Sequence, residues 1–541
     1  MLDFSGFRGD WWRGAVIYQI YPRSFADTNG DGVGDLPGVT AHLDHVARLG
    51  ADAIWLGPVF TSPQRDFGYD VADHMAIDPI FGTLEDFDAM IAHAHALGLR
   101  VLIDQVWSHT SDRHPWFSQS RATATGGYAD WYVWADASAD GTPPNNWLSV
   151  FGGAAWTWEP SRRQYYLHHF LSHQPQLNLH NPAVQNALLQ IGRFWLDRGV
   201  DGFRLDALDF FTHDPALQNN PAIAPGARVP AKLFGRQRHV HDMMQPETSA
   251  FLARIRELTD CYPGTVTLGE VSSQDGAFDR CRSYTREDVQ LNMAYSLLPA
   301  RQSFDWAGVR CLLHEAAAED GWLCWSFSNH DVERAVSRWN PARGQPPDAR
   351  FARLLMALQL TLRGSVLVYQ GEELGLTEAE LSEDQLQDPF GIAHWPAFRG
   401  RDGCRTPMPW IGGAQHGGFS SAAPWLPVPD AHLALAVDVQ EQDQFRLLHD
   451  WRRFLAYRRA HPALTRGRLR VLDLPEPLVG FIRHDAYEQV LCLFNLSTAN
   501  AAVPDGHAGA PAFLGPYGTA FSVQKPNCAV GPEATVGGLQ R

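Results

Sequence analysis

The chain has 541 residues, which is longer than one hydrophobic core usually serves, so two or three structural units are expected, although α/β barrels can run long as one. Its formal net charge is -16, and its only lysines are Lys232 and Lys525. This composition excludes the basic surface that nucleic acids and anionic membranes need, and it favours a neutral small-molecule substrate.

Seven cysteines are scattered along the chain without any C-x-x-C pair, which indicates free thiols in a reducing compartment. Near the start, Asp3, Arg8, Asp10 and Arg13 interrupt every apolar stretch, and no window of about eighteen apolar residues follows. We therefore expect a cytoplasmic protein without a membrane partner, as a monomer or homodimer.

The first unusual stretch runs from Asp27 to Asp35 (DTNGDGVGD), with oxygen side chains at alternate positions as in an EF-hand loop. The twelfth position of such a loop carries a bidentate Glu, but here it is Gly38, and a strand-like run precedes the loop. The EF-hand is thus excluded. The remaining oxygens can hold one structural Ca²⁺ or Mg²⁺ and come from Asp27, Asn29, Asp31, the Val33 carbonyl and Asp35. A metal-free loop closed by Asx turns is the alternative.

Short apolar runs recur along the chain, and a polar loop and a helical pattern follow most of them. They are residues 15–22, 51–59, 100–107, 200–208, 264–272, 289–297, 321–330 and 364–375. The stretches 36–50 and 84–98 between them have apolar residues at helical spacing and end in a Gly suited to a C-cap. This alternation predicts an α/β fold, a (β/α)₈ TIM barrel.

Two long excursions and a terminal change of pattern divide the chain further. Residues 108–175 are too long for a plain loop and predict a small inserted domain after the third strand. Residues 212–246 predict a lid or subdomain after the fourth strand. From about 460, alternating strands with turn signals predict a C-terminal antiparallel β-sandwich over 460–541. The barrel then comprises 1–107 and 176–459.

Charged and imidazole side chains end four of the predicted strands. They are Asp104 and His109, Arg204 and Asp206, Glu270, and His330 with Asp331. The carboxyl ends of barrel strands face the active site, so these side chains are expected to converge at one mouth. For any one of them, an ion pair at the mouth or a buried histidine is the alternative.

The runs DQVWSH, GFRLDALDF, LGEV and FSNHD resemble, in order and spacing, the four conserved regions of the α-amylase superfamily, glycoside hydrolase family 13. The runs QPQLN and GRDGCRTPMPW are similar to its α-glucosidase and oligo-1,6-glucosidase branch, and to bacterial α-glucosidases noted for glucosyl transfer. The resemblance covers nearly the whole chain. It implies a retaining, exo-acting α-glucosidase without a catalytic cofactor, which passes a glucosyl unit to water or to an alcohol or sugar acceptor.

By this resemblance Asp206 is the nucleophile, Glu270 the acid/base, and Asp331 the carboxylate that holds the 2- and 3-hydroxyls of the sugar. The chemistry agrees, because retention needs two carboxyl groups roughly 5 Å apart. Arg204 is expected to keep Asp206 ionised, while burial near other carboxylates keeps Glu270 protonated.

Further sugar contacts follow from the resemblance. His109 and His330 would hydrogen-bond that glucose, Asp66 would cap it, and Tyr69 would stack on it. Arg401 would reach its 4-hydroxyl, and Phe151 and Phe170 would form the walls of the pocket. An Asp66–Arg401 pair would close the site into a pocket, as exo action requires. A loop salt bridge and a local core role for the two phenylalanines are the alternatives.

Two positions depart from the family pattern, and a third bears on which glucosidic linkage is cleaved. Ser108 stands where many amylases have a calcium-binding Asn, and Gln176 where the branch often has Asp. Ala207 follows the expected nucleophile, where enzymes that cleave α-1,6 links typically carry Val. A small side chain there predicts a preference for α-1,4-linked maltose, although Ala207 could simply fit the barrel packing.

Two other classes of function compete with this prediction. An oligo-1,6-glucosidase, a sucrose isomerase or a trehalose synthase would use the same residues and differ only in its products. A non-catalytic relative would tend to have lost a catalytic carboxylate, and all three of Asp206, Glu270 and Asp331 are present.

Overall fold

The computed structural model describes residues 9–224, 232–273, 275–342 and 344–525. Parts of three predicted units, namely 1–8 of the barrel, 225–231 of the lid and 526–541 of the C-terminal unit, lie outside the described residues.

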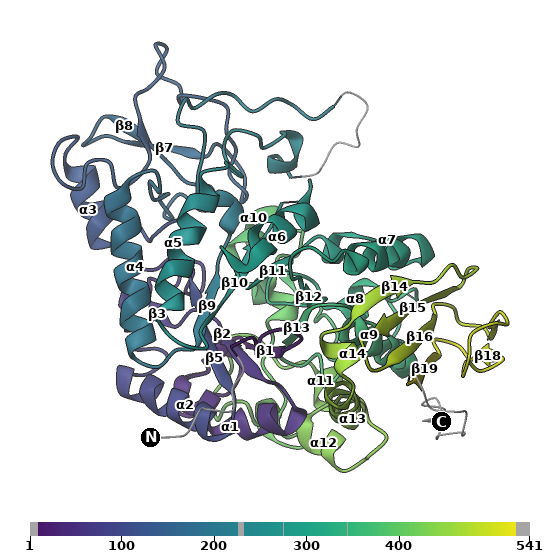
Figure 1. The fold of residues 1–541 in the computed structure, drawn as a ribbon. Helices are drawn as coiled ribbons and strands as arrows, with labels where there is room; N and C mark the ends of the chain where they lie inside the picture. Colours follow the sequence, from purple (N-terminus) through teal and green to yellow (C-terminus); the bar gives the residue numbers. More distant parts are fainter. Residues whose placement is uncertain (1–8, 225–231, 274, 343, 526–541) are drawn as a thin grey trace.

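Eight parallel strands form one barrel sheet in the order β11-β10-β9-β5-β2-β1-β13-β12 (Figure 1). They are β1 Val16–Ile20, β2 Ala53–Leu56, β5 Arg100–Gln105, β9 Gly202–Leu205, β10 Val266–Val271, β11 Met293–Ser296, β12 Cys324–Ser326 and β13 Ser365–Tyr369. A parallel bridge between Ala294 and Leu323 closes the sheet between β11 and β12. Each predicted run contains one of these strands, so the (β/α)₈ barrel is confirmed.

Helices surround this sheet (Figure 1). The longer ones are α1 Leu36–Leu49, α2 Leu84–Ala96, α4 Pro182–Asp197, α5 Thr248–Asp260, α6 Ala277–Thr285, α7 Trp306–Ala317, α9 Ala349–Thr361 and α13 Leu447–Ala460. Their ends follow the sequence signals. Asp35 caps α1 by accepting from the Gly38 N–H, and Gly50 ends it with a φ of 101°. Thr83 and Asp86 form a capping box before α2.

The predicted insertion carries a small sheet of its own, in the order β6-β8-β7, with α3 beside it (Figure 1). These elements are α3 Pro115–Ala122, β6 Trp134–Ala135, β7 Trp156–Glu159 and β8 Gln164–Leu167. Its core includes the fully buried Trp147 and Leu167. A separate sheet with its own core supports an inserted unit, but the boundaries 108–175 and 212–246 stay predictions.

The C-terminal unit is antiparallel and packs beside α7 and α9 (Figure 1). Four strands pair in the order β14-β15-β16-β19, and β17 pairs with β18. They are β14 Arg468–Val471, β15 Leu478–His484, β16 Gln489–Asn495, β17 Ala501–Ala502, β18 Phe513–Leu514 and β19 Thr519–Gln524. A separate cluster that includes Leu474, Leu493 and Leu514 fills the space between the two sheets, which confirms the predicted sandwich.

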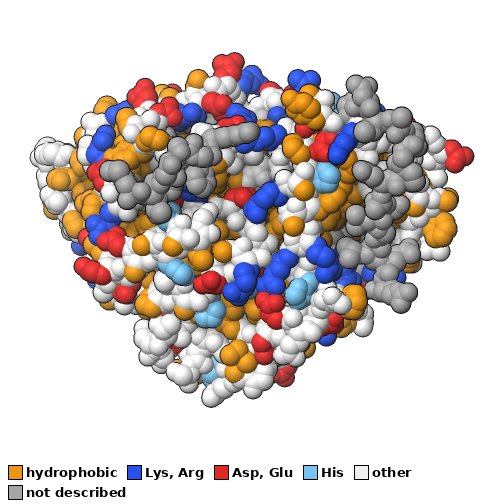
Figure 2. Space-filling model, turned by 60° about the horizontal axis from the view of Figure 1, so that its bottom comes forward, with side chains coloured by type: hydrophobic (Ala, Val, Ile, Leu, Met, Phe, Trp, Pro, Cys, Tyr) orange, Lys and Arg blue, Asp and Glu red, His pale blue; other side chains and the backbone are white. Residues whose placement is uncertain are grey.

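The charge distribution on the surface and the state of the cysteines can be compared with what the composition predicts. On the face shown in Figure 2, basic side chains lie among acidic ones rather than in a patch of their own. The six cysteines in the described ranges are free thiols. No helix in those ranges is long and apolar enough to cross a bilayer.

The predicted ion loop is held together by its own hydrogen bonds. The Asp27 carboxylate accepts three backbone N–H groups at 2.8–3.0 Å and the Ser420 hydroxyl at 2.5 Å. Asn29 and Asp31 each accept one backbone N–H, and Asp35 caps α1. Within the described ranges, no group of three or more His, Cys, Asp and Glu side chains is placed to hold a metal ion. These contacts agree with the metal-free alternative without deciding between the two, and a Ca²⁺ or Mg²⁺ ion here stays a prediction.

We expect Asp27→Ala to lower the free energy of unfolding by roughly 1–3 kcal/mol, because several donors lose their acceptor together. Asp31→Ala is the matched control, since that exposed side chain accepts only the Val33 N–H and its loss should cost less. Thermal and urea melts measure both. Equal losses in the two variants would contradict this account, and a melting temperature that falls in strong chelator would support a bound ion.

Candidate active site

One buried guanidinium joins four neighbouring strands at the mouth of the barrel. Arg204 Nη1, from β9, donates to Asp206 Oδ1 at 2.6 Å and to Asp104 Oδ1, on β5, at 2.7 Å. Its Nη2 donates to Glu270 Oε2, on β10, at 2.6 Å and to the hydroxyl of Tyr295, on β11, at 2.8 Å. The Arg204 side chain has no exposed surface. The strand order β11-β10-β9-β5 thus fixes two expected catalytic carboxylates on one cation.

Three carboxyl groups compete for this single positive charge. Burial raises the pKa of Asp104 to about 6 and the pKa values of Asp206 and Glu270 to about 7, while Arg204 acts to lower all three. Burial thus raises the pKa values of Asp206 and Glu270 alike, and the charge of Asp206 raises that of Glu270 further. Arg204 lowers the pKa of Asp206 as expected, but burial acts in the opposite direction, and an ionised Asp206 stays a prediction.

Ala207 contributes a backbone contact to the same pair. Its N–H donates to Glu270 Oε2 at 3.0 Å, on the same oxygen that Arg204 holds. The residue is 3% exposed and has a φ of 48°, in the left-handed region that non-glycine residues rarely adopt. This turn brings the backbone after Asp206 beneath the Glu270 carboxyl group.

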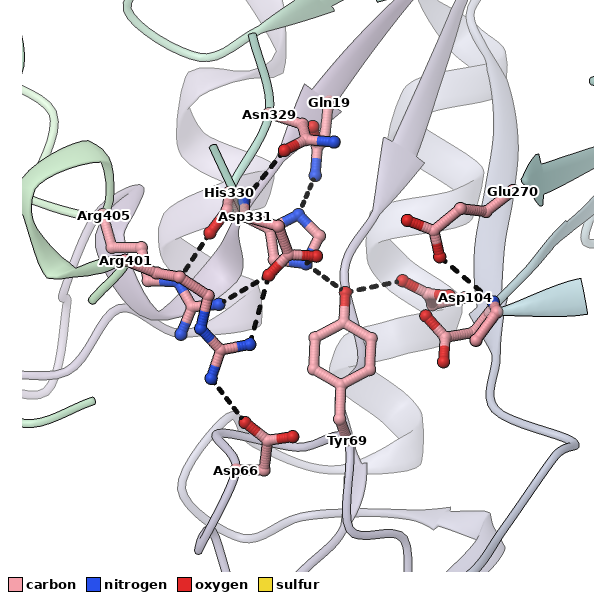
Figure 3. A network of polar contacts seen from close by, with 12 residues as sticks. Gln19, Asp66, Tyr69, Asp104, Glu270, Asn329, His330, Asp331, Arg401 and Arg405 are labelled. Carbon is pink, nitrogen blue, oxygen red and sulfur yellow. Dashed lines mark hydrogen bonds and ion pairs between the residues drawn. The ribbon is translucent and has the colours of Figure 1, made fainter. Parts of the chain in front are cut away.

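Asp331 has a different electrostatic environment (Figure 3). Its Oδ1 accepts from Arg405 Nη2 at 2.9 Å and from Arg401 Nη1 at 3.2 Å. Burial acts to raise the pKa of Asp331, but His330, Arg401 and Arg405 outweigh it and hold the pKa well below its usual range. Burial lowers the pKa of His330 to about 3, so at neutral pH the two arginines carry this effect. Asp331 is therefore ionised when the catalytic pair still holds a proton.

The predicted Asp66–Arg401 pair forms, and it is part of a larger network (Figure 3). Arg401 Nη2 lies 2.8 Å from Asp66 Oδ1 and 2.8 Å from Asp388 Oδ1. Gln174 Nε2 donates to the other oxygen of Asp66 at 3.0 Å. Because Arg401 also contacts Asp331, one guanidinium links the rim at Asp66 to the floor of the site.

Tyr69 stacks on His330 behind this network, with ring centroids 5.3 Å apart and planes 6° apart (Figure 3). The Tyr69 hydroxyl lies 2.5 Å from His330 Nε2 and 3.1 Å from Asp104 Oδ2. Gln19 Nε2 lies 2.7 Å from His330 Nδ1. Both ring nitrogens of His330 thus have protein partners, and a direct contact of His330 with a sugar stays a prediction.

His109 and the two expected wall residues lie beside this network. His109 Nε2 is 3.0 Å from the Tyr69 carbonyl oxygen, and burial lowers the pKa of His109 to about 3. The Phe170 ring lies 5.1 Å from the His109 ring, and the Phe151 ring lies 5.4 Å from Arg401 Cζ. A neutral imidazole and two aromatic rings therefore border the cavity.

These side chains line one cavity of about 1950 Å³ at the carboxyl ends of the strands. The predicted residues in its wall are Asp66, Tyr69, His109, Phe151, Phe170, Asp206, Ala207, Glu270, Asp331 and Arg401. Arg204 and His330 are fully buried and support this wall from behind. The predicted lid supplies further wall residues, including Phe234, Met243 and Met244.

Sequence reasoning did not assign roles to several residues of this site. They are Gln19, Asp104, Gln174, Tyr295, Asp388 and Arg405. Asp104 was expected at the barrel mouth but without a role, and Tyr295 lies near the end of β11, so its position could have indicated it. Asp388 lies outside every barrel strand, and nothing in its local sequence indicates a partner in Arg401.

We expect Arg204→Met to destabilise the fold by about 3–5 kcal/mol near pH 8, because three carboxylates lose their buried counter-charge. The folded pKa values lie above unfolded values near 4, so protonation favours the folded state, and stability falls as pH rises through about 7. The loss should therefore shrink towards pH 5, where the carboxyl groups take up protons.

Thermal melts at several pH values measure this loss. Adding Asp104→Asn to Arg204→Met removes one of the unpaired carboxylates and should restore part of the stability at about pH 8. A loss that is independent of pH would contradict the electrostatic account.

The sequence resembles known proteins over most of its length. Residues 19–467 match the alpha amylase catalytic domain. A probable alpha-glucosidase of Rhizobium meliloti (strain 1021) is 55% identical over 496 residues, which are 90% of this chain and 90% of that protein. An oligo-1,6-glucosidase of Heyndrickxia coagulans is 34% identical over 530 residues, covering 90% of this chain and 92% of that protein.

Solved structures agree with these relatives. An alpha-glucosyl transfer enzyme, XgtA, superposes with a TM-score of 0.91 at 51% identity, covering 95% of this chain and 99% of that one. The trehalulose synthase MutB from Pseudomonas mesoacidophila MX-45 superposes with a TM-score of 0.84 at 30% identity, covering 95% and 99%. The barrel, the carboxylates at its mouth and these similarities place the chain in the alpha-amylase family, glycoside hydrolase family 13, as an enzyme of the alpha-glucosidase and oligo-1,6-glucosidase group.

Proposed function

We propose that the protein is a retaining, exo-acting α-glucosidase that acts on short α-glucosides, with maltose preferred, and also transfers the glucosyl unit to small hydroxyl acceptors. One observation carries the proposal: Asp206 and Glu270 are bound to the two terminal nitrogens of the same guanidinium, that of Arg204. This arrangement favours the separation of about 5 Å that retaining enzymes use over the wider one of inverting enzymes.

The reaction then proceeds in two steps. Asp206 attacks the anomeric carbon while Glu270 gives its proton to the leaving oxygen, and a covalent glucosyl-enzyme forms. Water or an alcohol next attacks that carbon, Glu270 takes the proton, and the bond to Asp206 breaks. The charge of an ionised Asp206 raises the pKa of Glu270, which favours a proton on Glu270, as the first step needs. Enzymes of this family need no cofactor for this chemistry.

The Asp66–Arg401–Asp331 network supports exo action, because it closes the end of the site where a longer chain would continue. Asp66 and Arg401 would cap the terminal glucose, and the ionised Asp331 would accept hydrogen bonds from its 2- and 3-hydroxyls. Tyr69 would stack on that ring. A substrate can then present only its terminal unit to Asp206.

Apolar side chains on the other side of the carboxylates support glucosyl transfer. Ala207, Phe210 and Met243 form a cluster with Phe170 and Phe234 packed against it. Such a wall excludes water and can hold an alcohol in attack geometry, so transfer competes with hydrolysis. The likeness to an alpha-glucosyl transfer enzyme supports the same proposal.

A second candidate is an isomerising or α-1,6-specific enzyme on the same site. The similarity to a trehalulose synthase and to an oligo-1,6-glucosidase favours keeping it, although both are less similar in sequence than the alpha-glucosidase of Rhizobium meliloti. Analysis of the products from sucrose, isomaltose and maltose separates these candidates. A cytoplasmic location, a monomeric or homodimeric state and the structural cation stay predictions.

We predict that the two carboxylates fail differently when they are neutralised. Asp206→Asn should abolish turnover of every substrate, because no glucosyl-enzyme can form. Glu270→Gln should slow maltose cleavage by about 10²–10⁴-fold but spare the first step on nitrophenyl glucoside, whose leaving group needs little protonation. Azide should then restore the second step. Burst kinetics with and without azide measure both steps.

Asp104→Asn is the matched control, since it removes a carboxylate from the same guanidinium without removing one from the cavity wall. It should reduce activity without abolishing either step. Residual turnover in Asp206→Asn, together with no effect of azide on Glu270→Gln, would mean that the two roles are assigned wrongly.

A further prediction concerns the linkage. Ala207 lines the cavity beside the carboxylates, so a larger side chain should crowd the leaving sugar and lower the ratio of kcat/KM for maltose to that for isomaltose. The left-handed backbone at Ala207 strains a β-branched replacement, so Ala207→Val also carries a conformational cost. Ala207→Asn is the matched variant, because Asn tolerates that conformation and adds similar volume.

If volume decides the linkage, both variants lower the ratio. A ratio that changes only in Ala207→Val would point to backbone strain instead. Isomaltose as the better substrate of the unmodified enzyme would overturn the preference for maltose.

A further inference from the structure

Two segments of the predicted lid, residues 220–223 and 236–241, form its two limbs and meet at one buried asparagine, Asn220. Ala222 and Gln237 form an antiparallel bridge between the limbs. The Asn220 side-chain oxygen accepts the N–H groups of Val240 and His241 at 3.1 Å and 3.0 Å. Asn220 is only 3% exposed. The Asn220 amide therefore adds to the backbone pairing of the two limbs, in which the Ile223 N–H donates to the Arg236 carbonyl at 3.1 Å and the Arg238 N–H donates to the Pro221 carbonyl at 2.8 Å.

A second asparagine ties this lid to the inserted unit. Asn146 Nδ2 donates to the Asn220 carbonyl oxygen at 2.9 Å, and Asn146 Oδ1 accepts the Asn220 N–H at 2.9 Å. Around this pair, the Asn146 N–H donates to Asn219 Oδ1 at 3.0 Å and Gln237 Nε2 donates to the Asn146 carbonyl at 2.7 Å. With the bonds from Asn145 Nδ2 to the Leu217 carbonyl and from Trp147 Nε1 to the Gln218 carbonyl, at least six hydrogen bonds join these described segments, which lie more than 70 residues apart in the chain.

The joined limbs carry the wall of the cavity beside the catalytic carboxylates. Val240, Met243 and Met244 line that cavity together with Phe170 and Asp206. Met243 is buried against Ala207 and Phe210, and the Met244 N–H donates to the Asp209 carbonyl at 2.6 Å. The wall is therefore fixed at one end by the barrel and at the other by the asparagine pair.

We propose that Asn146 and Asn220 are positioning residues that set how the glucosyl-enzyme divides between an alcohol acceptor and water. The inference rests on the proposed function, because it needs a covalent glucosyl unit on Asp206. In transfer, the hydroxyl oxygen of the acceptor attacks the anomeric carbon, Glu270 takes its proton, and the bond to Asp206 breaks to restore the carboxylate. A wall held in place keeps that hydroxyl aligned, whereas a loose wall admits water.

The test uses the full-length enzyme with p-nitrophenyl α-glucoside as donor and benzyl alcohol as acceptor. Nitrophenol release reports total turnover, free glucose reports hydrolysis, and their difference reports transfer. The ratio of transfer to hydrolysis does not depend on how much enzyme is folded, so lost stability alone leaves it unchanged. The variants are Asn146→Ala, Asn220→Ala and the double variant.

We expect the ratio to fall about threefold to tenfold in each single variant, as the loss of one net hydrogen bond would cause. Initial nitrophenol release per active site should change less than about twofold, because the glucose-binding side is untouched. The double variant should resemble the more affected single one, since the Asn146 side chain holds the Asn220 backbone and the Asn220 side chain holds residues 240 and 241, so the two changes break successive links of one support.

Asn181→Ala is the matched control, because Asn181 caps α4 and its loss lowers stability without touching the lid. An unchanged ratio in the Asn146 and Asn220 variants, or an equal change in Asn181→Ala, overturns the inference. No release of nitrophenol by the unmodified enzyme would instead refute the proposed function, and the inference with it.

Discussion

Arg204 is one positive charge that four strands share, and the rest of the site depends on it. It lies between Asp104, Asp206 and Glu270 and is sealed from solvent. Its single positive charge therefore cannot neutralise all three carboxyl groups if each of them is ionised. Protonation reduces this excess of negative charge, because burial raises the pKa values of Asp206 and Glu270 to about 7. One cation thus holds Asp206 and Glu270 close together, as the proposed two-step glycoside cleavage requires.

The opposite arrangement surrounds Asp331. There two guanidinium groups serve one carboxylate, so its pKa lies well below the usual range and its charge is permanent. The same Arg401 reaches Asp66 and Asp388, so the group that fixes this charge also closes the cavity. Charge is therefore distributed unevenly: three carboxyl groups share one cation around Arg204, whereas two cations hold the one carboxylate of Asp331.

Much of this arrangement could be predicted from the sequence, because barrel topology converts strand order into proximity. Arg204 and Asp206 are two residues apart on one strand, and Glu270 ends the next, so their convergence follows from the fold. The Asp66–Arg401 pair needed the family resemblance as well. The contacts of Asn146 with Asn220 join two irregular segments with no periodicity, so no pattern indicated them.

Energetic features are harder to predict from the sequence than topology. Oxygen spacing in the loop around Asp27 predicted an ion, which stays a prediction, and the structure adds that backbone N–H groups and a serine hydroxyl donate to these oxygens. Proximity to Arg204 indicated an ionised Asp206, but the cost of burial and the neighbouring carboxylates could not be weighed from the sequence. Both depend on solvent exclusion, which only the packed structure reveals.

The measurement that most directly tests the central claim is the configuration of the first glucose released from maltose, followed by proton NMR before mutarotation. A covalent intermediate on Asp206 requires two inversions, so α-glucose should form first and the β-anomer should grow in only at the rate of mutarotation. Release of β-glucose as the first product would contradict the account, because it would mean that water, and not Asp206, attacks the anomeric carbon.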